Sequence, residues 1–194
     1  MNKALFIDRD GIINHLVKYN SGWDSPQKPQ DVKLVDGIEK VIVWANKQKI
    51  LVIEISNQHG VAKGKMSQKT SDNIEKRVHY LLKEKGVFID KAYICPHHPE
   101  AVVPKLTKDC DCRKPKPGLI LQAAKELGVN LSKSIFLGDN DSDVQAAKSA
   151  RVKSIIYLHS ENMPKKVKTA KLAKADFKVA TIQETHQILK SFFK

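Results

Sequence analysis

Near its N-terminus the chain reads Ala4-Leu5-Phe6-Ile7-Asp8-Arg9-Asp10-Gly11. A short apolar run that ends in a turn signal is typical of a parallel strand buried on both faces. Asp8 and Asp10 would then lie where the strand leaves the sheet, which is the edge at which open α/β sheets bind ligands. Alternate residues of an extended segment point the same way, so both carboxylates can face one cavity. Taken alone, the two acids are more typical of a solvated turn.

Apolar strands and amphipathic helices alternate along the rest of the chain. The predicted strands are residues 3–8, 50–55, 91–94, 134–137, 152–158 and 177–179. The predicted helices are residues 38–48, 67–85, 117–127, 143–150 and 182–193. This alternation indicates the α/β class with a Rossmann-like, doubly wound parallel sheet. We find no internal repeat and no linker, so we expect a single domain over residues 1–194.

The composition favours an anionic ligand but not a nucleic-acid site. The chain has 194 residues and a net charge of +13. Such an excess of positive charge attracts phosphate esters, nucleic acids and acidic membrane surfaces. The lysines of the last third, however, have neither clustered arginines nor interleaved aromatics, so we interpret them as a solvated helix face and expect no nucleic-acid partner. They are Lys165, Lys166, Lys168, Lys171 and Lys174.

The start of the chain and its cysteines bear on location. The first residues lead directly into a predicted strand, with no secretory signal, and no apolar run is long enough to span a bilayer. Three cysteines do not make a disulfide framework. We therefore expect a cytoplasmic protein without a membrane partner, and its oligomeric state, monomer included, stays open.

Four separate stretches are expected to deliver polar groups to one edge of the sheet. They are Asp8 with Asp10, Ser56 with Asn57, Arg113 with Lys114, and Asp139 with Asp143. Two close carboxylates repel each other unless a cation or a proton shares the site, which suggests Mg²⁺. Phosphoryl transfer needs such a set: a nucleophile, a cation that neutralises oxygens, and donors around the transferred group. Asp8 and Asp139 are the predicted Mg²⁺ ligands, while Ser56 and Lys114 are predicted to bind the phosphoryl oxygens.

A second constellation lies in the long irregular stretch between the third predicted strand and the helix at Pro117. It combines Cys95-Pro96-His97 with Cys110-Asp111-Cys112, and it contains every cysteine of the chain. Two short pairs of this kind can supply a closed tetrahedral Cys₃His site, which is typical of structural zinc. His98 competes with His97 for the fourth position. Since Arg113 and Lys114 follow Cys112 directly, a metal there would fix the direction of both cations.

At these residues the sequence resembles the haloacid dehalogenase superfamily of phosphatases. Asp8-Arg9-Asp10-Gly11 is similar to its first motif, Ser56 to its second, Lys114 to its third, and Gly138-Asp139 through Asp143 to its fourth. The resemblance implies that Asp8 attacks phosphorus and forms an aspartyl-phosphate. It also implies that Asp10 protonates the leaving oxygen, then activates water, and binds Mg²⁺ through its backbone carbonyl. Asp143 would orient a Mg²⁺-bound water or Lys114.

Two longer stretches narrow the resemblance. Residues 94–99 with 110–118, and residues 56–64, are similar to the D-glycero-D-manno-heptose 1,7-bisphosphate phosphatases and the related histidinol-phosphate phosphatases. This implies a capless phosphatase that removes the C7 phosphate during surface-polysaccharide (lipopolysaccharide) precursor synthesis. Histidinol-phosphate phosphatase, polynucleotide 3′-phosphatase and a zinc-stapled phosphate-binding module without activity are the alternatives.

The walls of the substrate pocket are expected to come from loops. Asn57, Gln58 and Arg113 are the predicted substrate contacts. A guanidinium such as that of Arg113 can bind a second phosphate or sugar hydroxyls through two parallel hydrogen bonds. Its alternative role is a salt bridge that holds the cysteine loop. In the loop 14–29, Tyr19 and Trp23 either line the pocket or anchor the loop, and the sequence favours neither.

Overall fold

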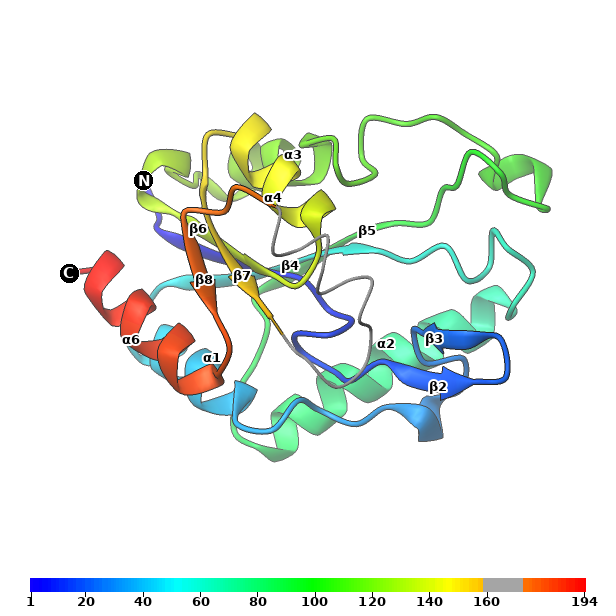
Figure 1. Ribbon diagram of the computed structural model, residues 1–194, viewed down its shortest axis with the longest axis horizontal. Helices are drawn as coiled ribbons and strands as arrows, with labels where there is room; N and C mark the ends of the chain where they lie inside the picture. Colours follow the sequence, from blue (N-terminus) through cyan, green and yellow to red (C-terminus); the bar gives the residue numbers. More distant parts are fainter. Residues whose placement is uncertain (159–172) are drawn as a thin grey trace.

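The computed structural model describes residues 1–158 and 173–194 of the chain, and its centre is a six-stranded parallel sheet (Figure 1). The strand order is β5-β4-β1-β6-β7-β8. The strands are β1 (Ala4–Ile7), β4 (Leu51–Asn57), β5 (Lys91–Cys95), β6 (Ile135–Gly138), β7 (Lys153–Tyr157) and β8 (Phe177–Val179). The predicted α/β class and its doubly wound parallel sheet are confirmed.

Helices cover both faces of this sheet. On one face lie α1 (Ile38–Lys47), α2 (Gln68–Glu84) and α6 (Ile182–Phe192), and on the other lie α3 (Gly118–Leu127) and α4 (Asp141–Ser149) (Figure 1). The alternation of side chains along β1 explains why both faces need cover. Leu5 and Ile7 are buried with the first group of helices, whereas Ala4 and Phe6 are buried with the second.

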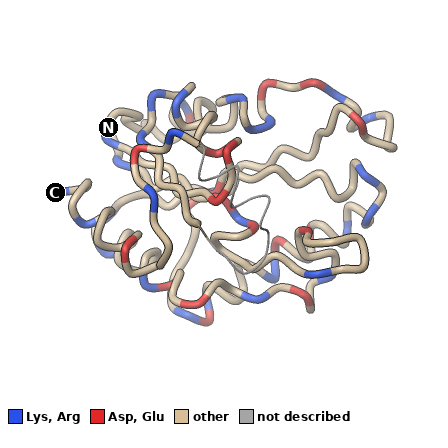
Figure 2. Tube along the Cα trace, viewed as in Figure 1, with Lys and Arg blue, Asp and Glu red and all other residues tan. Residues whose placement is uncertain are grey.

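The strand order places β1 between β4 and β6, and these three strands end at the same edge. From β1 the chain first builds the sheet toward β5 and then crosses back to build it toward β8. Such a reversal of strand order opens a crevice at the carboxyl ends of the central strands. Acidic positions meet a basic one at the centre of the molecule, near this crevice (Figure 2).

The sequence predicted most element ends to within about two residues. The largest differences follow β1, where the chain forms an antiparallel hairpin of β2 (Val17–Tyr19) and β3 (Gly22–Asp24) instead of an irregular loop. Its strands are too short and too polar to give a periodic signal. Three short 3₁₀ helices were also missed: η1 (Pro29–Asp31), η2 (Pro104–Leu106) and η3 (Leu131–Lys133).

The two aromatic residues of this hairpin have different roles. The hydroxyl of Tyr19 donates to Asp31 Oδ2 (2.7 Å) and accepts from the backbone N–H of Gln27 (2.9 Å). Tyr19 therefore anchors the loop, while Trp23 lines the pocket described below.

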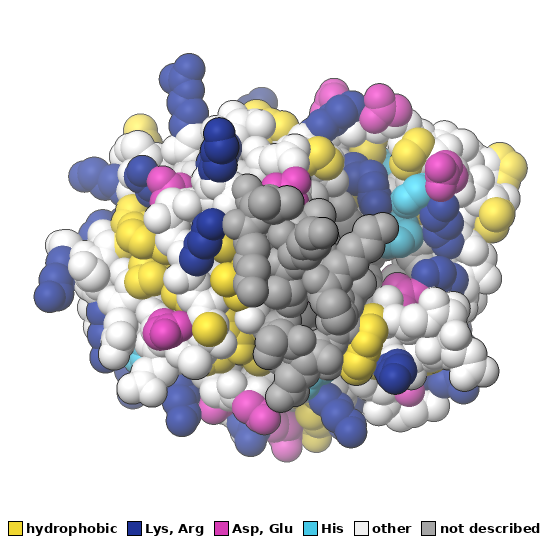
Figure 3. All heavy atoms as spheres, in the orientation of Figure 1, with side chains coloured by type: hydrophobic (Ala, Val, Ile, Leu, Met, Phe, Trp, Pro, Cys, Tyr) yellow, Lys and Arg dark blue, Asp and Glu magenta, His cyan; other side chains and the backbone are white. Residues whose placement is uncertain are grey.

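The distribution of Lys and Arg on the surface is relevant to the predictions about nucleic-acid and membrane partners. Of the predicted lysine-rich face, Lys165 to Lys171 lie outside the described residues, and Lys174 is exposed. The Lys and Arg side chains visible in Figure 3 are spread over that view rather than gathered in one stripe. Among the described residues, no helix has the length and apolarity that crossing a membrane requires.

Candidate active site and cysteine loop

The ammonium group of Lys114 joins the ends of several strands. It donates to Asp8 Oδ1 (2.8 Å) and to the carbonyl of Ile55 (2.7 Å), and it lies 2.7 Å from Asp143 Oδ1. Lys114 is 4% exposed, and burial of an ammonium lowers its pKa. The carboxylates of Asp143 and Asp8 outweigh this effect, so the pKa of Lys114 lies above its ordinary value and the side chain is a buried cation.

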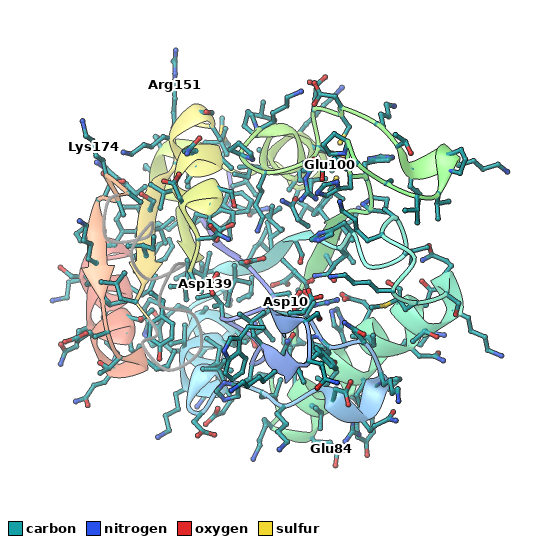
Figure 4. All side chains as sticks on the ribbon, turned by 45° about the vertical axis from the view of Figure 1, so that its right-hand side comes forward. Asp10, Glu84, Glu100, Asp139, Arg151 and Lys174 are labelled. Atoms are coloured by element: carbon teal, nitrogen blue, oxygen red, sulfur yellow. The ribbon has the colours of Figure 1, made fainter. Side chains whose placement is uncertain are left out.

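A third carboxylate, that of Asp139, completes this cluster. Oxygens of Asp8, Asp139 and Asp143 lie within 4.8 Å of one another, and all three residues are buried. Gly11 permits the approach: its φ is +97°, and a Cβ there would lie 2.0 Å from Asp139 Oδ2. Asp10 and Asp139 lie near each other at the centre of Figure 4, beyond β1 and β6. A hard donor set of clustered carboxylates fits Mg²⁺.

Without a divalent cation, the charge of Asp8 is unfavourable. Burial, followed in effect by the Asp143 and Asp139 carboxylates, outweighs Lys114 and raises the pKa of Asp8 from 3.8 to about 7. Below this pH the folded protein favours a protonated Asp8, and an additional positive charge would favour the carboxylate. This is a second reason why the cluster fits a divalent cation.

The raised pKa predicts a pH dependence of stability. Because the pKa of Asp8 is higher in the folded state, the folded state binds more protons between pH 3.8 and about 7. The contribution of Asp8 is therefore present at low pH and is lost as the pH rises through this window. Without divalent ions, we expect the free energy of unfolding to fall with pH relative to Asp8→Asn, as measured by urea denaturation. A constant difference between the two proteins would contradict this, and saturating Mg²⁺ should flatten it.

Asp10 has the opposite environment. Burial raises its pKa, but Arg9, followed by the donors Gln58, Asn14 and Ser25, lowers it to about 2. The guanidinium of Arg9 lies 3.3 Å from Oδ1 and 3.2 Å from Oδ2. Asn14 donates to Oδ1 at 2.9 Å and Ser25 to Oδ2 at 2.8 Å. The pKa values of Asp8 and Asp10 thus shift in opposite directions, because burial and two carboxylates outweigh Lys114 at Asp8, whereas Arg9 and three further donors outweigh burial at Asp10.

The residues that end β4 hold these groups in place. Ser56 is 1% exposed, and its hydroxyl accepts a hydrogen bond from Gln58 Nε2 (2.7 Å). The Asn57 amide makes two hydrogen bonds, both 3.0 Å, to the backbone N–H and carbonyl of Lys114. Asn57 therefore fixes the loop that carries Lys114.

Gln58, a predicted substrate contact, has its side chain bound to other residues of the site. Its Nε2 donates to Asp10 Oδ2 (2.6 Å) as well as to Ser56, and its Oε1 accepts from Arg9. Gln58 is also not among the residues that line the main pocket. The amide supports Asp10 and Ser56 in this structure, and a contact of Gln58 with the substrate stays a prediction.

A pocket of about 530 Å³ opens over this cluster. Its floor includes Asp8, Asp10, Ser56 and Lys114, and its walls include residues of the β2–β3 hairpin and of the cysteine loop. The wall residues used below are Trp23, Asn57, His59 and Arg113. The pocket therefore offers room for a phosphorylated small molecule above the carboxylates.

The four predicted ligands of the cysteine loop lie together. The Sγ atoms of Cys95, Cys110 and Cys112 are 3.1–3.5 Å apart, and His97 Nδ1 lies 3.4 Å from Cys112 Sγ. A zinc–sulfur bond of about 2.3 Å puts tetrahedral sulfurs about 3.8 Å apart, slightly more than these distances. The three cysteines form no disulfide. Soft thiolates with an imidazole fit a closed structural zinc site.

The structure distinguishes the two neighbouring histidines. His98 faces away from the cysteines: its Nδ1 accepts from the backbone N–H of Glu100 (3.0 Å), and its ring centre lies 5.2 Å from that of His59. The fourth residue of the cluster is therefore His97. Arg113 Nη1 donates to the carbonyl of His97 (3.1 Å), so the cysteine loop also holds this pocket residue.

Sequence reasoning missed several residues of this site. Arg9 is 2% exposed and binds Asp10, Glu75 and Gln58, although it lies inside the motif that drew attention to Asp8. The signal was available, since an arginine between two acids at a buried strand end needs anionic partners. Asn14 and Ser25 had no such signal, because the hairpin that brings Ser25 to Asp10 was not predicted.

The comparisons with known proteins agree with this geometry. Residues 111–185 match the family model described as HAD-hydrolase-like. A D-glycero-alpha-D-manno-heptose-1,7-bisphosphate 7-phosphatase of Photorhabdus laumondii is 40% identical over 77% of this chain and 79% of its own. A D-glycero-beta-D-manno-heptose-1,7-bisphosphate 7-phosphatase of Escherichia coli is 33% identical over 77% of this chain and 75% of its own.

Solved structures share the whole fold. A putative HAD-like phosphatase from Mesorhizobium loti has a TM-score of 0.81 at 29% identity and covers 99% of this chain and 86% of its own. A D,D-heptose 1,7-bisphosphate phosphatase from B. bronchiseptica, complexed with magnesium and phosphate, has a TM-score of 0.80 at 23% identity. It covers 97% of this chain and 98% of its own. At that identity, the second likeness concerns the fold alone.

Proposed function

Since the chain belongs to the haloacid dehalogenase-like (HAD) phosphatases, we propose that it removes the C7 phosphate of a D-glycero-D-manno-heptose 1,7-bisphosphate with Asp8 as nucleophile. The observation that carries the chemistry is Asp8 at the floor of the pocket, bound by buried Lys114 beside Asp139 and Asp143. The substrate rests on the names of relatives that cover more than three quarters of this chain. The product would supply lipopolysaccharide precursor synthesis.

In this proposal, the chain's own groups bind and orient the phosphate. Asp8, Asp139 and the Asp10 carbonyl would hold Mg²⁺, which would supply positive charge that offsets the repulsion between Asp8 and the substrate phosphate. Lys114 and the Ser56 hydroxyl bind phosphoryl oxygens, and Asp143 keeps Lys114 in place. Asp8 Oδ attacks phosphorus, the bond from phosphorus to the sugar oxygen breaks, and an aspartyl-phosphate forms.

In this proposal, Asp10 acts as the general acid and then as the general base. In the second half of the reaction a carboxylate takes a proton from the hydrolytic water, and Arg9 and the other donors, which lower the pKa of Asp10, keep it in the charged form that this step needs. In the first half it must donate a proton to the sugar oxygen. A phosphate dianion beside Asp10 favours its protonated form, because a like charge raises the pKa of a carboxyl group.

We also propose zinc for the cysteine loop, as a structural ion. The four ligands Cys95, His97, Cys110 and Cys112 close the coordination sphere, which leaves no position for substrate or water. Its proposed function is to fix the loop from which Arg113 and Lys114 enter the pocket. The zinc is thus separate from the phosphoryl-transfer chemistry.

Arg113 is the proposed contact for the part of the substrate that does not react. The side chain lines the pocket and is held by the His97 carbonyl. A hydrogen bond to a charged group contributes about 1.5–3 kcal/mol, so Arg113→Ala should raise KM about 10- to 100-fold with little change in kcat. Steady-state kinetics on the bisphosphate test this, and Arg113→Lys is the conservative control. A 10- to 100-fold loss in kcat with an unchanged KM would contradict a binding role.

The assignment of substrate is tested by initial rates of phosphate release with Mg²⁺. The substrates are the α and β anomers of the heptose bisphosphate, histidinol phosphate and a 3′-phosphorylated oligonucleotide at matched concentrations. We expect one heptose anomer to exceed the others by orders of magnitude and its product to retain the C1 phosphate. Comparable slow rates on all four would refute the heptose assignment and leave the phosphatase chemistry in place.

A further inference from the structure

A second cluster of titratable side chains lies between β4 and α2. Glu54, near the middle of β4, is an acidic residue between apolar strand neighbours, and it is 0% exposed. Strand alternation puts Glu54 on the same face as Val52, which packs in the core that includes residues of α2. Glu75 and His79 lie four residues apart on α2, so they share one helix face. The three side chains meet between helix and sheet.

The ligand atoms of this cluster lie close enough to one another to share an ion. His79 Nε2 lies 3.1 Å from Glu75 Oε1 and 3.6 Å from Glu54 Oε2, and the three ligand atoms lie within 4.8 Å of one another. Ligands that bind one metal ion at about 2.1 Å are about 3.0–3.5 Å apart, so small movements of these side chains would allow all three to bind one ion. Within the described chain, Glu75 Oε1, His79 Nε2 and both oxygens of Glu54 lack a hydrogen bond of acceptable geometry.

The negative charges around this cluster are also not fully balanced by positive ones. Arg9 Nη1 binds the other oxygen of Glu75 (2.8 Å), and the same guanidinium binds Asp10. With a neutral His79, the arginine, Asp10 and the two glutamates sum to two negative charges. Burying uncompensated carboxylates is costly, and a proton on His79 removes only one of these charges. A divalent cation removes both.

We propose that Glu54, Glu75 and His79 bind a divalent first-row transition metal ion. One imidazole nitrogen and two carboxylates form a borderline donor set of the kind that suits ions from Mn²⁺ to Zn²⁺. Mg²⁺ is a poorer match, because it prefers oxygen ligands alone. Glu75 and His79 are partly exposed, so water can reach the ion and complete its coordination. The site shares no residue with the carboxylate cluster Asp8, Asp139 and Asp143. Arg9 lies between the two sites, because it binds Glu75 on one side and Asp10 on the other.

Co²⁺ binding to zinc-loaded protein tests this proposal, with bound metal counted by equilibrium dialysis. The parent for the test is Asp139→Asn, in which the pocket cluster has lost a carboxylate. We expect this protein to bind one Co²⁺, and His79→Gln in the same background to lose it. Glu54→Gln should lose it as well. The matched control is His186→Gln, because His186 on α6 packs against Trp44 and belongs to none of the metal-like clusters among the described residues.

A ligand-specific signal separates loss of the site from loss of the fold. An imidazole bound to Co²⁺ gives a paramagnetically shifted ring N–H resonance, which should be present in the parent and in His186→Gln but absent in His79→Gln. If the parent binds no Co²⁺, or if His79→Gln retains both the ion and the shifted resonance, the proposal is overturned. The cluster would then be an ion pair of protonated His79 with the two glutamates.

Discussion

Asp8→Asn should reduce kcat by about 10⁴-fold or more, on the scale at which removal of a covalent nucleophile acts in other hydrolases. The amide oxygen is too weak a nucleophile to attack phosphorus, while its shape still fits between Lys114 and the neighbouring carboxylates. The free energy of unfolding without divalent ions should not decrease at neutral pH, because the substitution removes the charge of Asp8, which burial and the neighbouring carboxylates make unfavourable, as its raised pKa of about 7 indicates. Steady-state rates and urea denaturation measure the two effects.

The control for this substitution is Asp36→Asn, which changes an exposed carboxylate just before α1. It should leave kcat and zinc content unchanged. Zinc content of Asp8→Asn should also equal that of the unmodified protein, since Asp8 is not a member of the cysteine cluster. An Asp8→Asn protein that kept most of its activity would contradict nucleophilic catalysis by this residue.

Cys110→Ser should remove zinc and reduce kcat/KM by about 10²-fold or more, because a displacement of about 1 Å at catalytic groups has an effect of that size. Cys110 and Cys95 are buried in the core cluster next to α3, so losing the ion loosens the loop that carries Arg113 and Lys114. Burial raises the pKa of the Cys95 and Cys112 thiols, so zinc uptake should release protons. Metal analysis, kinetics and calorimetry in buffers of different ionisation enthalpy measure these effects.

His98→Gln is the matched control for the loop, since His98 is adjacent to His97 in sequence but contacts His59 and Glu100 instead of the cysteines. It should retain zinc. Full activity in a metal-free Cys110→Ser protein would contradict the structural role proposed for the ion. Loss of zinc in His98→Gln would show that His98, and not His97, is the fourth ligand.

The sheet could be predicted from sequence because its central strands β1, β4 and β6 are short, mostly apolar runs that end in polar clusters. The same feature predicted the place of Asp8, Ser56 and Asp139, since parallel strands bring their carboxyl ends to one edge. The burial of Ile38, Val41, Ile42 and Ala45 on α1 followed from helical periodicity alone. In these cases local pattern and tertiary structure follow the same rule.

The remainder depended on contacts between segments far apart in sequence. Ser25 reaches Asp10 only because the β2–β3 hairpin folds over the strand end. Glu54 was not among the predicted site residues, and its partners are evident only when α2 places Glu75 and His79 opposite it. The side chain of Gln58 binds Asp10, which is far away in sequence, as well as Ser56, and no local pattern predicts this pairing. Contacts between distant segments do not produce a periodic pattern in the sequence, so they could not be predicted from it.

The central claim is that phosphate passes through Asp8. The most direct test is rapid acid quench of the Mg²⁺-loaded protein after mixing with heptose bisphosphate radiolabelled at the C7 phosphate, followed by identification of the labelled peptide. We predict acid-stable label on the peptide that contains Asp8, its release as phosphate when turnover continues, and no label on Asp8→Asn. Turnover without label on this peptide, together with activity in Asp8→Asn, would show that water attacks the substrate directly and would contradict the account.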